Sequence, residues 1–148
     1  MPETKPCILA TRRLPPNVEA RLSRDYRATL NGDDTTYSSA EIIEAADGHD
    51  GILCCGTEKF SADVISALPE SVKILATFSV GYEHIDIDAA VKRGLKVTNT
   101  PEVLNDATAD IAILCLLAAA RRGAEGDRLV RNDEWKGWHT TKIGRAHV

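Results

Sequence analysis

Short apolar runs alternate with amphipathic stretches along the first hundred residues of the chain. Five runs have the length and composition of buried strands, at residues 6–11, 26–30, 51–55, 72–80 and 95–98. The stretches between them place apolar residues at helical spacing over about ten residues. Parallel strands require such crossovers, because the chain must return to the same end of the sheet. The pattern therefore predicts an α/β fold, a parallel sheet covered by helices on both faces.

Polar residues mark where the intervening helices begin and end. Ser38 and Glu41 have the spacing of a capping box, and Ser61 and Asp86 are suited to cap the next two helices. Gly94 is suited to end the last of these helices, because glycine adopts the left-handed conformation without steric cost. The resulting order of elements is typical of a flavodoxin-like sheet.

A different pattern follows residue 100. Thr100 and Pro101 form a good helix opening, and a helix is predicted from about Glu102 to Arg122. Its second half is apolar on nearly every side, which is typical of a helix buried between layers. An isolated five-stranded domain would leave half of this helix facing water. We therefore expect a further layer, absent from these residues, to cover it.

The composition is that of one ordinary soluble domain. The 148 residues include 18 lysines and arginines against 22 aspartates and glutamates, a net charge of −4, and the basic residues are scattered. Nucleic-acid binding requires a concentrated basic surface and is not expected. The first residues lack the apolar stretch of a signal peptide, and the longest apolar run, Ile111 to Ala120, is half of the roughly 20 residues that cross a membrane. We expect a cytoplasmic protein without a membrane segment.

The cysteines and histidines indicate no metal site. Cys7, Cys54, Cys55 and Cys115 lie in aliphatic surroundings without a CxxC pair, and we expect them to be reduced core thiols. Cys54 and Cys55 would point to opposite faces of a strand, which is a poor geometry for holding one metal ion. The four histidines show no ligand spacing.

The segment SVGYEHID, residues 79–86, carries the most informative chemistry. Like residues 56–58, it includes a loop at the carboxyl end of a predicted strand, where small ligands bind in sheets of this kind. Gly81 can adopt a positive φ, so that successive backbone N–H groups point outward and bind an anion such as a carboxylate. A glycine that ends a strand is more often a plain turn. Asp86 is likewise more often a helix cap than an acid or base.

A longer stretch around this corner is similar to a known family. The run SVGYEHIDIDAAVKRGLKVTNTPEVLNDATADIAILCLLAAARR, residues 79–122, resembles the D-2-hydroxyacid dehydrogenases, in particular the glyoxylate and hydroxypyruvate reductases. The similarity extends from about residue 5 to the EWKGW at residues 134–138. It implies a flavodoxin-like substrate domain and a Rossmann NAD(P) domain, with the active site between them. It also implies an oxidoreductase that interconverts small 2-oxo acids and D-2-hydroxy acids by hydride transfer.

The resemblance assigns roles to several residues. It implies that the N–H groups of Val80 and Gly81 hold the carboxylate of the substrate, with Cys55 and Gly56 near the same pocket. It places Thr108 near the nicotinamide end of NAD or NADP. The apolar helix would cross to the cofactor domain, which accounts for its hydrophobicity, and would contribute to a homodimer in the full-length protein.

Other features of the family are absent from residues 1–148. No GxGxxG follows a strand, and the residue that selects between NAD and NADP is absent with it. The resemblance places the catalytic Arg, Glu and His of the family later in the chain, so no catalytic residue is assigned. His84 and His139 are not taken as substitutes. We expect these residues to form an inactive fragment that retains the substrate-binding part.

The chain is accordingly divided into three parts. Residues 1–100 are predicted to form the substrate-binding domain, and residues 101–138 an interdomain helix with the start of the cofactor region. Residues 139–148 are predicted to be an unrelated tail. Its last seven residues, KIGRAHV, match the translation of a common sequencing adapter, and we expect them to be an assembly artefact that truncates a longer reading frame.

A second interpretation is a self-standing flavodoxin-like module that binds a small carboxylate or a protein partner without catalysis. It requires the long apolar helix to be covered in some other way. A stable monomer without an exposed apolar patch would favour this module, whereas aggregation or dye binding would favour a fragment.

Overall fold

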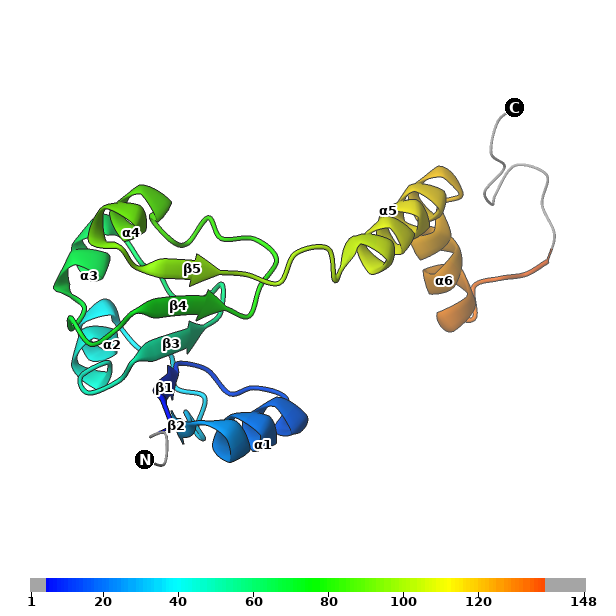
Figure 1. Cartoon of the computed structure of the whole chain (residues 1–148). Coiled ribbons are helices and arrows are strands. Elements are labelled where there is room, and N and C mark those ends of the chain that lie inside the picture. Colours follow the sequence, from blue (N-terminus) through cyan, green and yellow to red (C-terminus); the bar gives the residue numbers. More distant parts are fainter. Residues whose placement is uncertain (1–4, 138–148) are drawn as a thin grey trace. The chain divides into compact units, whose positions relative to one another are not determined.

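A computed structural model describes residues 5–137 and contains two compact units, the first reaching Glu102 and the second beginning at Val103 (Figure 1). In the first unit, strands and helices alternate as the sequence predicts. Its elements are β1 (Cys7–Ala10), α1 (Pro16–Asp25), β2 (Arg27–Thr29), α2 (Ser39–Ala45), β3 (Gly51–Cys54), α3 (Ala62–Ala67), β4 (Ile74–Thr77), α4 (Ile87–Arg93) and β5 (Lys96–Thr98).

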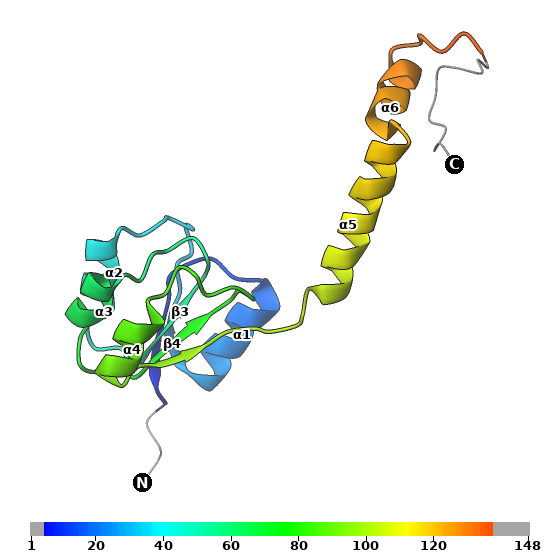
Figure 2. The same cartoon turned by 90° about the horizontal axis from the view of Figure 1, so that it is seen from above.

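The five strands form one parallel sheet in the order β2-β1-β3-β4-β5. Helices α2, α3 and α4 lie on one face of this sheet, and α1 lies on the other (Figures 1 and 2). All five carboxyl ends therefore lie at the same edge. The predicted flavodoxin-like α/β fold is confirmed.

The predicted caps are present. The Ser38 hydroxyl accepts a hydrogen bond from the backbone N–H of Glu41, and the Glu41 carboxylate accepts one from the N–H of Ser38, which completes the capping box. Ser61 and Asp86 cap α3 and α4 with their side chains. Gly94 follows α4 with a φ of 72°. These local bonds satisfy N–H groups that a helix leaves unpaired in its first turn.

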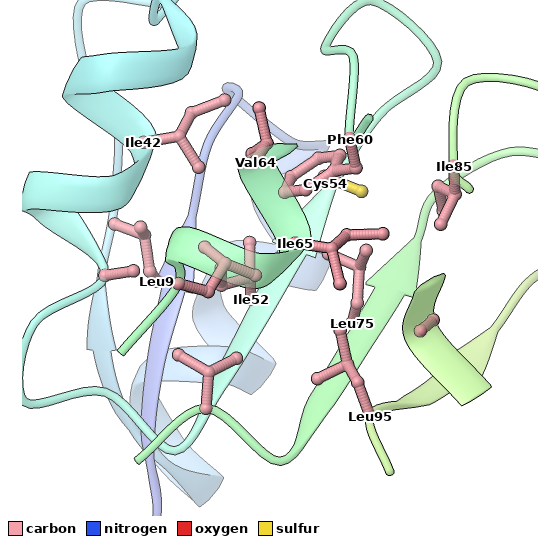
Figure 3. Close-up of a cluster of buried hydrophobic side chains, with 14 residues drawn as sticks. Leu9, Ile42, Ile52, Cys54, Phe60, Val64, Ile65, Leu75, Ile85 and Leu95 are labelled. Carbon is pink, nitrogen blue, oxygen red and sulfur yellow. The ribbon is translucent and has the colours of Figure 1, made fainter. Parts of the chain in front are cut away.

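The larger core lies between the sheet and helices α2 to α4 (Figure 3). Phe60 is its largest fully buried side chain, and the loop that carries it is tied to the next loop by two backbone hydrogen bonds. The N–H of Phe60 donates to the carbonyl of His84 at 2.8 Å, and the N–H of Asp86 donates to the carbonyl of Phe60 at 2.9 Å. Cys54 belongs to this core, whereas Cys55 packs with the core under α1. The two side chains occupy opposite faces, as predicted.

The fourth strand is shorter than its apolar run. β4 ends at Thr77 and not at Val80, and the chain bends through residues 78–80. Local side-chain bonds are present at this point: the hydroxyls of Thr77 and Ser79 lie 2.6 Å apart, and the Ser79 hydroxyl donates to the carbonyl of Gly81 at 2.7 Å. Serine and threonine hydroxyls compete in this way with regular backbone pairing.

The second unit consists of α5 (Asn105–Ala120) and α6 (Gly123–Arg131). The prediction of one helix from Glu102 to Arg122 is wrong at both ends. Glu102 has a φ of 66°, which is incompatible with a helix, so residues 101–104 form turns and Thr100 is not the cap. Arg122 has a φ of 52° and separates α5 from α6, a helix that the pattern did not predict.

Helix α5 is exposed along its whole length within the described residues. Five of its large aliphatic side chains are more than half exposed, namely Ile111, Ile113, Leu114, Leu116 and Leu117. Cys115 is exposed as well, so the prediction of a core thiol is wrong at this position, because no described residue covers this part of the helix. Within residues 5–137, no helix has both the length and the hydrophobicity needed to cross a membrane.

Candidate functional site

The loops that follow β3 and β4 line one open pocket of about 500 Å³. Both loops leave the same edge of the sheet because β3 and β4 are parallel neighbours, with Cys54 opposite Thr77. The lining residues are Gly56, Thr57, Glu58, Lys59, Ser79, Gly81, Glu83 and His84. The two loops that the sequence marks as a binding region are therefore brought together by the fold.

The predicted site residues lie at or beside this pocket. Gly56 and Gly81 line it, and Cys55 and Val80 are their immediate neighbours in the chain. Within the described part of the chain, the N–H groups of Val80 and Gly81 donate no hydrogen bond. Two consecutive unpaired amides beside a pocket are suited to bind an anion such as a carboxylate, because backbone donors need no positive side chain.

Gly81 does not have the positive φ that the sequence analysis expected. The glycines with positive φ in the described residues are Gly48, Gly94 and Gly137. A Cβ atom at residue 81 would meet only the carboxylate end of the flexible Glu83 side chain, so the contact does not by itself require glycine here. The outward amides therefore do not come from a left-handed turn.

Three polar side chains stiffen the corner next to Gly81. The Ser79 hydroxyl has one proton and donates it to the carbonyl of Gly81, so it accepts from the Thr77 hydroxyl. The Thr77 hydroxyl in turn accepts from Nε2 of His84 at 3.1 Å, which places a proton on this nitrogen. The chain of hydrogen bonds runs from His84 through Thr77 to Ser79 and ends on the backbone carbonyl of Gly81.

Glu58 organises the opposite loop. Its side chain is buried, and Oε2 accepts a hydrogen bond from the N–H of Cys55 at 3.0 Å. Its other oxygen, Oε1, is buried and has no partner among the described residues. Burial, followed by the negative charge of Glu58, raises the pKa of the Cys55 thiol. Cys55 is thus a neutral thiol at the edge of the site.

Arg12 ties the end of β1 to the same loop. Its guanidinium donates to the Thr57 hydroxyl at 2.8 Å and to the Asp34 carboxylate at 2.8 and 3.0 Å. This ion pair and the N–H of Arg13 hold the pKa of Asp34 at about 2. Arg12 therefore fixes the loop after β3 at its far side.

Sequence reasoning missed one residue that shapes the corner, Asn99, and it included Glu58 in the loop at residues 56–58 without giving it a role. The side-chain amide of Asn99 donates to the carbonyl of Val80 at 2.8 Å. Asn99 is a polar side chain just beyond the carboxyl end of β5, so the rule that selected the other loops would also have selected it. Thr108 lies exposed in α5, in the second unit, and its predicted role at the cofactor stays a prediction.

The residues described hold no group of three or more His, Cys, Asp or Glu side chains arranged to bind a metal ion. The predicted tail at residues 139–148 lies outside the described residues.

Comparison with known proteins places the chain in a family. The profile of the D-isomer specific 2-hydroxyacid dehydrogenase catalytic domain matches residues 8–144. The chain belongs to this family. It is 40% identical over 140 residues to the glycerate dehydrogenase of Hyphomicrobium methylovorum, a match that covers 95% of the chain and 44% of that protein.

A relative from another organism has the same sequence identity to this chain. The glyoxylate reductase of Thermococcus litoralis is 40% identical over 139 residues, which cover 91% of this chain and 42% of that protein. The solved structure of an NADPH-dependent glyoxylate/hydroxypyruvate reductase from Sinorhizobium meliloti, in complex with NADP and malonate, has a TM-score of 0.75 and 27% identity, and the match covers 95% of this chain and 43% of that one. The chain thus spans less than half the length of these relatives.

Proposed function

We propose that this chain is the substrate-binding part of an NAD(P)-dependent oxidoreductase that interconverts small 2-oxo acids with D-2-hydroxy acids by hydride transfer. The observation that carries the proposal is the pair of unpaired amides at Val80 and Gly81 beside the pocket. Membership of the 2-hydroxyacid dehydrogenases and the printed activities of the relatives support it, and these activities name glyoxylate, hydroxypyruvate and glycerate as substrates.

In this proposal the substrate carboxylate accepts hydrogen bonds from the N–H groups of Val80 and Gly81. Each charge-assisted bond of this kind contributes roughly 1.5–3 kcal/mol. Gly56 lines the pocket from the loop after β3, and Cys55 directly precedes it in the chain. The same loop brings Lys59 to the pocket lining, whereas the guanidinium of Arg12 is paired with Asp34.

The nicotinamide cofactor supplies or accepts the hydride. Residues 1–148 lack the glycine-rich dinucleotide turn, so they do not form a cofactor site by themselves. Thr108 is the residue of this chain that we propose to lie near the nicotinamide. We further propose that the exposed aliphatic side chains of α5 are covered in the full-length protein and that this protein is a homodimer.

Oxalate tests the proposed carboxylate site, because it is a small planar acid anion that resembles a 2-oxo acid. The ¹⁵N-labelled 148-residue chain is titrated with oxalate, and its backbone amide resonances are followed by NMR. We expect the resonances of Val80 and Gly81 to shift first and furthest. Replacement Gly81→Val should weaken binding at least tenfold, because its side chain fills the face of the pocket that Glu83 approaches.

Gly32→Val is the matched control. Gly32 has no positive φ, and a Cβ there meets no atom within 4 Å. Oxalate binding that leaves Val80 and Gly81 unperturbed, or that survives Gly81→Val, would show that the carboxylate lies elsewhere. Incubation of the purified chain with NADH or NADPH and glyoxylate should give no turnover, and turnover at the rate of an ordinary enzyme would contradict the assignment of the catalytic groups to residues outside this chain.

A further inference from the structure

The three consecutive carbonyl groups of residues 79–81 each accept a hydrogen bond, and these bonds hold the backbone that carries the proposed anion site. The N–H of Thr100 donates to the carbonyl of Ser79 at 3.0 Å. The Nδ2 amide of Asn99 donates to the carbonyl of Val80 at 2.8 Å, and the Ser79 hydroxyl donates to the carbonyl of Gly81 at 2.7 Å. Two of the three donors come from the segment that directly follows β5.

These bonds fix the direction of the N–H groups on the other side of each peptide. No described peptide bond is cis, and in a trans peptide the C=O and N–H groups point in opposite directions. The peptide whose oxygen belongs to Ser79 carries the N–H of Val80, and the peptide whose oxygen belongs to Val80 carries the N–H of Gly81. Thr100 therefore orients the first donor of the anion site, and Asn99 orients the second.

We propose that Asn99 is a positioning residue for the carboxylate site. It acts through the peptide between Val80 and Gly81 and does not touch the substrate. This inference rests on the proposed function, because it assumes that the Gly81 N–H binds a carboxylate. A hydrogen bond to the peptide oxygen also polarises the peptide, so that its N–H becomes a better donor to an anion.

The type of side chain and its place in the fold both suit this role. Asn99 is half-buried, and a neutral amide donor holds the carbonyl without adding a charge beside the bound anion. Residue 99 directly follows β5, whose Thr98 pairs with Ala76 of β4, so the end of β5 runs alongside the start of the corner. The contact joins residues 19 positions apart, and it is made by the side chain and not by the sheet ladder.

A purely structural role is the competing explanation, in which Asn99 only fastens the end of β5. The two roles are separated by titrating ¹⁵N-labelled chain with oxalate, in the wild type, in Asn99→Ala and in the control Asn17→Ala, which makes the same change at an exposed position of α1. We expect Asn99→Ala to weaken oxalate binding roughly 3- to 10-fold, the equivalent of one neutral hydrogen bond. The control should bind like the wild type.

The site-resolved response is the sharper readout. In Asn99→Ala the oxalate-induced shift of the Gly81 amide should shrink more than that of the Val80 amide, because Thr100 still holds the peptide of Val80. Asn99→Leu preserves the approximate shape of the side chain without its donor and should behave like Asn99→Ala. Wild-type affinity in either variant, or an equal loss at both amides, overturns the inference.

The wild-type chain provides a measurement that needs no variant. Oxalate should also shift the Nδ2 resonance of Asn99, because the anion, the peptide and the side-chain amide form one continuous chain of hydrogen bonds. An Asn99 resonance that does not respond while Val80 and Gly81 shift would overturn the positioning role alone. A wild-type titration in which neither Val80 nor Gly81 responds would instead overturn the proposed function.

Discussion

The two phenylalanines of the chain provide a matched test of where the core lies. Phe60 is 0% exposed and stands at the centre of the cluster under α2 to α4, whereas Phe78 is 46% exposed just after β4. The same substitution to alanine therefore removes the same atoms from a closed and from an open environment. We expect Phe60→Ala to destabilise the first unit more than Phe78→Ala.

The magnitudes follow from the buried area. A phenylalanine buries at least about 150 Å², which at roughly 25 cal/mol per Å² corresponds to about 4 kcal/mol, within the range of about 3–5 kcal/mol typical of Phe→Ala in a core. Phe78 hides about half of its surface, which at the same coefficient corresponds to about 2 kcal/mol, without the added cost of a cavity in the core. Because a domain of this size is stable by about 5–15 kcal/mol, the Phe60 variant retains only part of its stability.

Urea unfolding followed by circular dichroism measures both variants against the wild type. The urea concentration at the midpoint of unfolding should fall further for Phe60→Ala than for Phe78→Ala. The dependence of the free energy of unfolding on urea concentration should be similar for the three proteins. The bonds between Phe60 and its neighbours His84 and Asp86 are made by the backbone, so the folded fraction of the variant should keep the pocket loops in place. Equal losses at the two positions, or a loss below about 1 kcal/mol at Phe60, would refute this account of the core.

Three further outcomes follow from the described contacts. Ser38→Ala removes the side-chain half of the capping box and should lower the free energy of unfolding by about 1 kcal/mol in urea titrations, and an unchanged midpoint would contradict the cap. Iodoacetamide at pH 8 should modify exposed Cys115 first and buried Cys54 last, since burial raises the pKa of Cys54 to about 12, and mass spectrometry of the labelled peptides would expose the reverse order. Because the pKa of Asp34 is lowered from 3.8 to about 2, its ion pair with Arg12 stabilises the fold above pH 4 and is lost as the pH falls toward 2. The difference in stability between the wild type and Asp34→Asn should therefore shrink over this range, and a difference that stays constant in acid unfolding would rule the pair out as its source.

The order of elements was predictable because its signals are local. The apolar run of a strand, the spacing of Ser38 and Glu41, and the glycine after α4 each act within a few residues, and each predicted feature is present in the fold. The ends of elements were less predictable. β4 ends three residues before its apolar run, where the hydroxyl of Ser79 bonds to the carbonyl of Gly81, and the hydrophobic pattern does not record such local side-chain bonds.

The sequence predicted where the candidate site lies, but not its backbone conformation or its hydrogen bonds. The carboxyl ends of parallel neighbours meet at one edge, so the pattern alone selected the loops around Gly56 and Gly81. It assigned the wrong backbone conformation to Gly81, because glycine permits a left-handed φ but does not require one. The partner that orients the Gly81 peptide, Asn99, was not identified from the pattern at all.

The sequence by itself determined the fold class, the helix caps and the edge at which a small acid is expected to bind, since these depend on periodicity and on contacts between near neighbours. Only the tertiary structure of residues 5–137 decided which amides lack a partner among these residues, how Glu58 is buried with one oxygen unpaired among them, and which side chain holds the peptide of Gly81. The physical reason is distance along the chain. The bond from Asn99 to Val80 spans 19 residues and that from Arg12 to Thr57 spans 45, and such pairs meet only after the strands have paired.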